Sequence, residues 1–206
     1  MYFEISQEFL EKLDKDRRTP VHEFAKRNDS DTMEDIFQTI PSEHWIGLLS
    51  AQDRDGNTPL HEAVRGNEKA WLKTVMHWIT DEEKLTLFKC ENSKKETPLR
   101  ISLAVQSGFT EISELLECLN ADERRQLLSM QEKFGRTALH LAVAEGQRNS
   151  IGNLSCLLRS LDYHNSQPTE GWKVEILNIA DVNGQTVLHV ISAEVMIRVP
   201  LLKAYL

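Results

Sequence analysis

Apolar positions along this chain recur with the period of short amphipathic helices. A spacing of i, i+3, i+4 and i+7 places side chains on one face of an α-helix. Whole or partial versions of this spacing occur in four segments: Met33, Ile36, Phe37 and Ile40; Leu72, Val75, Met76 and Ile79; Leu115, Leu116 and Leu119, with Ile112; and Ile151, Leu154 and Leu158. The pattern predicts four helices, each with one apolar face that must pack against a neighbour.

A second pattern precedes these helices and recurs along the chain. It is a four-residue motif that begins with Thr and in most copies ends with His: Thr19-Pro20-Val21-His22, Thr58-Pro59-Leu60-His61, Thr97-Pro98-Leu99-Arg100, Thr137-Ala138-Leu139-His140 and Thr186-Val187-Leu188-His189. Thr caps helix N-termini and Pro fits the first helical position. Turn sequences with glycine, Gly56, Gly135 and Gly184, stand just before three of the motifs. We therefore expect a tight turn followed by a helix in each repeat.

A third short helix is expected between the second helix and the next turn. Apolar pairs lie ten and nine residues before each later Thr, at Leu48-Leu49, Leu87-Phe88, Leu127-Leu128 and Ile176-Leu177. Ahead of two of them stand candidate capping boxes, Thr80 with Glu83 and Asn120 with Glu123.

With these motifs the sequence resembles the ankyrin-repeat family, whose signature is TPLH followed by a pair of helices. The resemblance implies an all-α solenoid of helix pairs with β-turn fingers, to which most repeats here add a short helix. It covers residues 17–206 as about five repeats starting near 17, 56, 95, 135 and 184, the last one incomplete. The repeats exceed the usual length of about 33 residues, and Arg100 replaces the histidine of the third. The elongated repeats are similar to ankyrin effectors of intracellular bacterial pathogens, many of which are delivered into host cells.

The two ends of the repeat region differ. Residues 1–16 predict an N-terminal capping helix, with Phe3, Ile5, Phe9, Leu10 and Leu13 among charged residues. No polar cap follows the last repeat before Leu206, although terminal repeats normally carry one. This leads to the hypothesis that the chain continues into a further domain or that this end meets another subunit.

Composition narrows the function classes. Among 206 residues, 32 Asp and Glu face 24 Lys and Arg, a net charge of −8, which argues against nucleic acid as a partner. The sequence contains no apolar run long enough for a transmembrane segment and begins without a secretory signal. Its three cysteines, Cys90, Cys118 and Cys156, favour a reducing compartment. These features predict a cytoplasmic protein, or one translocated into a host cytosol.

Candidate catalytic and metal-binding groups do not form a constellation in the sequence. The repeated histidines are spaced by one repeat, about 10 Å in a helical stack, which is too far apart to share a metal ion. The resemblance to ankyrin repeats implies that they are structural imidazoles, which bond the backbone of adjacent turns. His22-Glu23 and His61-Glu62 begin like a zinc-protease helix, but Lys26 and Arg65 stand where the second histidine is needed. We expect no enzyme activity, cofactor or metal. An enzyme built around Cys156 and His164 is the weakest alternative.

The tryptophans and one insertion each allow two interpretations, one structural and one in which they contact a partner. Trp71 and Trp78 share a helix face, and either pack against neighbouring helices or anchor a partner, as do Trp45 and Trp172. The longest repeat interval holds a polar insertion over 162–172, expected to be an exposed loop that serves either as a ligand contact or as a tolerated surface loop.

The resemblance implies that turn tips and exposed sides of the first helices form a concave, partner-binding surface. The residues expected there are Arg54, Asp55, Glu62, Arg65, Lys94, Lys95, Lys133, Phe134, Arg136 and Glu145. The predicted function is a non-enzymatic scaffold that binds a host or cellular protein on this surface. The alternative is a targeting or substrate-recruiting module of a longer multidomain enzyme whose catalytic part lies beyond residue 206.

Overall fold

A computed structural model of the chain describes residues 6–66, 68–104, 116–144, 154, 157–159 and 170–193. The chain divides into two compact units, Met1–Val105 and Gln106–Leu206, which are treated separately below. In the described ranges the regular structure is helical, apart from one isolated bridge between Ala180 and Thr186. This part of the chain is therefore all-α, as the pattern of apolar positions predicts.

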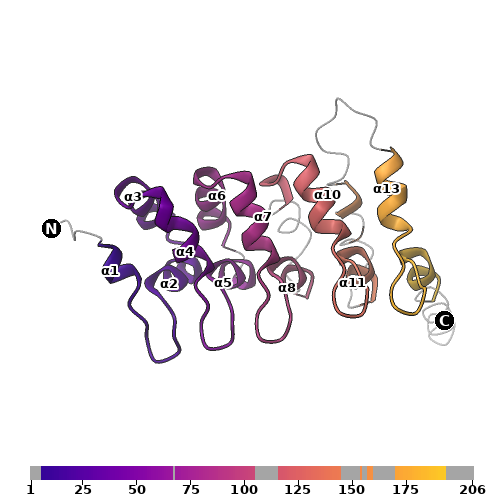
Figure 1. Ribbon diagram of the computed structural model, residues 1–206, viewed down its shortest axis with the longest axis horizontal. Coiled ribbons are helices and arrows are strands. Elements are labelled where there is room, and N and C mark those ends of the chain that lie inside the picture. Colours follow the sequence, from indigo (N-terminus) through magenta and orange to yellow (C-terminus); the bar gives the residue numbers. More distant parts are fainter. Residues whose placement is uncertain are drawn as a thin grey trace, which may run out of the picture. The chain divides into compact units, whose positions relative to one another are not determined.

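The first unit consists of short helices joined by turns: α1 (Gln7–Leu10), α2 (Pro20–Arg27), α3 (Ser30–Thr39), η1 (Ser42–His44), α4 (Trp45–Ser50), α5 (Pro59–Gly66), α6 (Lys69–Trp78), α7 (Asp81–Lys89) and α8 (Pro98–Ala104). The first helices of successive repeats, α2, α5 and α8, lie side by side, and α3 packs against α6 (Figure 1). The turns that precede α2, α5 and α8 all project to the same side of the unit.

In its described residues the second unit contains third helices, turns and first helices in the same order as the first unit. Its described helices are α10 (Ala121–Ser129), α11 (Ala138–Ala144) and α13 (Glu170–Leu177), and a further helical segment covers residues 187–193. Helix α10 packs against α11 and α13. As in the first unit, a turn connects each third helix to the first helix of the next repeat.

The predicted apolar faces are buried where they are described. The first two stripes belong to α3 and α6, and in each the last residue is the C-cap of the helix. All eight stripe residues are buried: Met33, Ile36, Phe37, Ile40, Leu72, Val75, Met76 and Ile79. Leu116 and Leu119 are buried as well. In the fourth stripe Leu154 and Leu158 are half-buried, and Leu157, which the predicted stripe left out, is fully buried. Ile112, Leu115 and Ile151 lie outside the described residues.

The third helices are present and begin where the capping boxes predict. Thr80 and Asn120 are N-caps whose side chains accept the backbone N–H of Glu83 and Glu123, and both Glu side chains accept the N–H of the cap residue in return. Reciprocal bonds of this kind satisfy N–H groups that have no partner within the helix. The apolar pairs that follow, such as Leu87-Phe88, are buried, which fixes these helices against their neighbours.

Helix α1 occupies the same register as the third helices. Phe9 and Leu10 stand ten and nine residues before Thr19, and Leu10 is fully buried like its equivalents Leu49, Phe88 and Leu128. The helix spans only Gln7–Leu10, shorter than the capping helix expected from the apolar pattern, and Phe9 is 45% exposed. We interpret α1 as structurally equivalent to a third helix, a register that the sequence analysis missed.

The tryptophans mostly pack inside the first unit. Trp71 has no exposed surface. The rings of Phe37, Trp45 and Trp78 form a cluster with centroid separations of 4.9, 5.7 and 5.9 Å. Trp172 lies in the first turn of α13 and not in a loop, so the insertion ends before residue 170; residues 160–169 lie outside the described part.

Candidate functional site

Five turns of one geometry connect the repeats. Each begins with an acidic residue or an asparagine five residues before the motif Thr: Asp14, Asp53, Asn92, Glu132 and Asp181. An Oδ1 of Asp53 accepts the N–H of Asp55 at 2.9 Å and that of Asn57 at 2.8 Å. The same pair of bonds, from the residues two and four positions on, recurs in the other four turns. The first residue of the turn was not among the predicted site residues, although its fixed distance of five residues from each motif Thr could have identified it.

The fourth residue of every turn has a left-handed backbone. Its φ is +76° at Gly56, +74° at Gly135 and Gly184, and close to +60° at Arg17 and Lys95. Glycine takes this conformation without steric cost, whereas a residue with a Cβ is strained there. At Gly56 an added Cβ would lie 2.7 Å from the backbone nitrogen of Ser93. Two requirements, the positive φ and the close approach of the next turn, therefore select glycine at this position.

Neighbouring turns are joined by backbone hydrogen bonds. In the first unit Arg54 N–H donates to the carbonyl of Asp16 at 2.8 Å, and Ser93 N–H donates to that of Asp55 at 2.9 Å. In the second unit Val182 N–H donates to the carbonyl of Phe134 at 3.0 Å. We call each such set of linked turns a turn ladder. The Nε2 of Gln52 adds a cross-link, since it donates to the carbonyls of Gly56 and Glu91.

The motif histidines connect each repeat to the next turn. Nδ1 of His61 accepts the N–H of Thr58 at 3.1 Å and lies 2.8 Å from the Thr58 hydroxyl. Because Nδ1 accepts, the proton sits on Nε2, which donates to the carbonyl of Glu96 at 3.0 Å. His22 and His140 make the same contacts to Asn57 and Gln185. The prediction of structural imidazoles bonded to adjacent turns is confirmed for these three residues.

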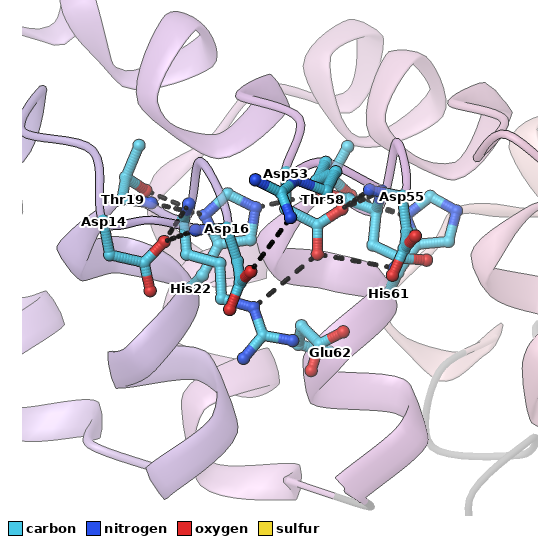
Figure 2. A network of polar contacts seen from close by, with 12 residues as sticks. Asp14, Asp16, Thr19, His22, Asp53, Asp55, Thr58, His61 and Glu62 are labelled. Atoms are coloured by element: carbon cyan, nitrogen blue, oxygen red, sulfur yellow. Dashed lines mark hydrogen bonds and ion pairs between the residues drawn. The ribbon is translucent and has the colours of Figure 1, made fainter.

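Buried polar side chains connect the turns of the first unit. Asp53 lies 3.7 Å from the Nε of Arg18, within the network of polar contacts that Figure 2 draws around His22 and His61. The Nδ2 of Asn92 donates to the Oδ1 of Asn57 at 3.1 Å. Asp53, Asn57 and Asn92 are all buried. Buried polar groups are costly unless they are hydrogen-bonded, so these contacts fix the spacing between consecutive turns.

The local environment shifts the pKa of several groups. Burial lowers the pKa of His22 and of His61 below 6.5, the ordinary value for imidazole. Hydrogen bonds from the backbone N–H groups of Arg18 and Gln185 lower the pKa of the Asp14 and Asp181 carboxyls, respectively. Asp14 is exposed and Asp181 is half-buried, and in both the ionised form is stabilised mainly by the turn itself.

The structure separates the predicted binding residues by exposure. Seven of them are exposed on turns or on the first helices: Arg54, Asp55, Arg65, Lys94, Lys95, Lys133 and Phe134. Glu62 was wrongly expected to be exposed: it is buried, with only 7% of its surface accessible, and accepts a hydrogen bond of 2.6 Å from Arg65. Arg136 is only partly exposed, and Glu145 lies outside the described residues.

Several of the predicted cations are already engaged within the chain. Arg65 pairs with Glu62, and its Nη2 also reaches the Oδ1 of Asn57 at 3.4 Å. The Nε of Arg136 donates to Glu132 at 3.0 Å. These two arginines therefore contribute to the turn structure, and they are less available for a partner than the sequence suggested.

Phe134 is the exposed aromatic side chain on a turn tip. It is 48% exposed. The Nζ of Lys133 lies 4.7 Å from the centre of its ring, and the guanidinium carbon of Arg136 lies 5.3 Å away. Cations at these distances are attracted by the π electrons of the ring, so the tip combines apolar and cationic character.

The described thiols are half-buried. The Sγ of Cys90 lies 3.4 Å from the carbonyl of Thr86, and burial raises the pKa of this thiol, which disfavours the reactive thiolate. Cys118 is also half-buried, whereas Cys156 and His164 lie outside the described residues. Within the described ranges, no three His, Cys, Asp or Glu side chains form a group able to hold a metal ion.

The described helices include none with the length and apolar character needed to cross a membrane. No protein-family model matches this chain, and no curated protein matches it significantly.

Proposed function

We propose that this protein is an ankyrin-type repeat solenoid that binds another protein through its turn tips and the exposed sides of its first helices, without an enzymatic reaction. The observation that carries the proposal is the regular exposure of the tips. The second residue of each turn is exposed, and so is the third in four of the five turns, the exception being half-buried Asp16. In all five turns the side chain of the first residue accepts the N–H groups of the residues two and four positions on.

A surface of this kind suits protein binding because its backbone is held before the partner arrives. Two kinds of hydrogen bond fix the spacing of the tips. One is the backbone bond between neighbouring turns, such as Arg54 N–H to the carbonyl of Asp16, and the other is the bond from a motif histidine to the next turn. Binding then costs little ordering entropy, so more of the contact energy appears as affinity. The side chains on the tips are variable in charge and size, which is the property a recognition surface needs.

The non-enzymatic part of the proposal is supported by the state of the motif histidines. Both ring nitrogens of His22, His61 and His140 are occupied by hydrogen bonds within the chain. A general base needs a nitrogen that can reach substrate. These imidazoles hold the repeats together instead.

The partner class that we propose is a host protein in a host-cell cytosol. The support is the third helix that lengthens each repeat, which is present as α4, α7, α10 and α13. This lengthening makes the repeats similar to those of ankyrin effectors from intracellular bacterial pathogens. A eukaryotic lysate is therefore the appropriate source of candidate partners.

The test compares capture by the wild-type chain with capture by a tip variant. Asp55→Lys, Lys94→Glu and Lys133→Glu change charges that stand on the tips, and Lys73→Glu on α6 is the matched control away from the turns. Proteins captured by the wild type and by the control should be lost from the triple variant, as measured by quantitative mass spectrometry. An unchanged set of captured proteins would rule out the turn tips as the binding surface.

A further inference from the structure

One patch on the second unit has a composition that specifies what it binds. We propose that the tips of its two described turns, defined here as the unit-2 tips (Lys133, Phe134 and Val182), bind a protein segment that places a carboxylate beside a large apolar side chain. This inference rests on the proposed function and names the partner chemistry for one part of that surface.

The apolar half of the patch consists of two exposed residues on neighbouring turns. Phe134 is 48% exposed and Val182 is 67% exposed. The two tips are held together because Val182 N–H donates to the carbonyl of Phe134 at 3.0 Å. Large apolar side chains that are exposed next to each other on a fixed backbone are typical of interaction sites. An aliphatic or aromatic side chain of the partner would cover both.

The charged half of the patch is the Lys133 ammonium group. It lies over the Phe134 ring and makes no ion pair within the described part of the chain. The other charged groups of the two turns have partners. Glu132 bonds to Arg136, and the Asp181 carboxylate accepts the N–H groups of the residues two and four positions on. The N–H groups that bond Asp181 are neutral, so this carboxylate keeps its charge at the start of its turn. Among the second and third residues of the two turns, Lys133, Phe134, Val182 and Asn183, the charged one is Lys133, and a partner carboxylate would pair with it.

The first unit shows what a tip without this character looks like. There the Nη1 of Arg54 lies 3.7 Å from the Oδ1 of Asp16, so the charges of two adjacent tips offset each other. The tip residues beside them, Asp55, Ser93 and Lys94, are polar. The same turn geometry thus presents a polar surface in one unit and an apolar, cationic surface in the other. The first unit serves as an internal control.

The experiment follows the backbone amide chemical shifts of the isotopically labelled 206-residue chain during titration with capped octapeptides. The probe has the sequence GSELFEGS, the charge control is GSKLFKGS, and the apolar control is GSESSEGS. Isolated contacts of this size bind in the millimolar range, so peptide is added to about 5 mM. We expect shifts at residues 133–136 and 181–184 with the probe, and much smaller ones with either control.

Variants separate the two halves of the site. Lys133→Gln should weaken probe binding about threefold and Lys133→Glu about tenfold, since the second change adds repulsion. Phe134→Ala should weaken binding about tenfold, whereas Lys94→Glu on a tip of the first unit should leave it unchanged. Amide spectra of each variant outside the two turns report whether the fold is retained, and Val182→Ser provides a second apolar probe.

Each outcome decides the proposal. Absence of shifts at the unit-2 tips, equal binding of GSKLFKGS, or shifts caused instead by an oligothymidylate would overturn it. If the lysate capture depends on Asp55 and Lys94 but not on Lys133, the proposed function stands and this inference fails. If capture is independent of all three residues, both fail.

Discussion

The Nε2–H of His61 donates to the backbone carbonyl of Glu96, 35 residues further along the chain, at a distance of 3.0 Å. The same imidazole accepts the N–H of Thr58 through Nδ1. One side chain thus fixes the start of its own helix and the position of the next turn. A contact that repeats along the chain in this way makes the stability of the protein depend on a few buried imidazoles.

Replacement of His61 with alanine is expected to destabilise the first unit strongly. The change leaves the Thr58 N–H without its acceptor in a buried site and removes a donor from the Glu96 carbonyl, which together cost about 2–4 kcal/mol. The matched control is His189→Ala, because His189 is exposed and, among the described residues, its ring bonds only to Thr186. Urea unfolding followed by circular dichroism should show a much smaller loss for the control. Equal losses would contradict the importance of the bond to the next turn.

Stability is expected to fall as the pH drops below 6.5. His22 and His61 have a folded-state pKa lowered by burial, so the unfolded chain binds protons first. Their stabilising effect is complete above pH 6.5 and is lost as the pH falls toward the folded-state values, with a slope of up to about 1.4 kcal/mol per pH unit for each group. Urea midpoints measured between pH 5 and 8 test this. The variant His22→Asn should show a shallower dependence over the same range, and an identical pH profile would contradict the assignment.

Two glycines with the same backbone angle should respond differently to alanine. Gly56 and Gly184 have φ of +76° and +74°, but only at Gly56 does the new Cβ meet another turn, at 2.7 Å from Ser93 N. We expect about 1 kcal/mol of destabilisation for Gly184→Ala from backbone strain, and about 3 kcal/mol for Gly56→Ala because the ladder must also shift. Thermal unfolding of both variants measures the difference. Similar losses at the two sites would show that the ladder tolerates displacement.

Charge reversal separates structural from exposed cations on the predicted surface. Arg65→Glu places a second carboxylate beside the buried Glu62, and we expect a loss of about 2–3 kcal/mol. Lys94→Glu changes an exposed tip and should alter the unfolding free energy by less than about 0.5 kcal/mol. Denaturant unfolding of the two variants provides the test. A stable Arg65→Glu variant would show that the buried carboxylate does not depend on its partner.

Much of the fold could be predicted from local patterns because each helix is encoded by nearby residues. The spacing of Leu72, Val75 and Met76 identified a buried face, and Thr80 with Glu83 identified the start of α7. The predicted stripe left out the buried Leu157, because a stripe based on three residues does not determine how wide the buried face is. Adjacent side chains differ by only about 100° around a helix, so both Leu157 and Leu158 can contact a neighbour.

The candidate site was only partly predictable, because exposure depends on residues distant in sequence. Glu62 occupies a position that a single helix would expose, yet neighbouring elements bury it beside Arg65. That Lys133 has no ion pair in the described residues, whereas Arg136 is paired with Glu132, likewise became visible only in the structure.

The sequence by itself determined the helices, their caps, the turns and the repeat distance, because these depend on the period of apolar residues and on local backbone bonds. Only the tertiary structure decided which side chains face a neighbour and which face solvent. It gave each buried histidine its particular partner carbonyl in the following repeat, such as Glu96 for His61, and it placed Phe134 beside Val182. These relationships join residues 35 to 48 positions apart, and they form only when one repeat stacks on the next.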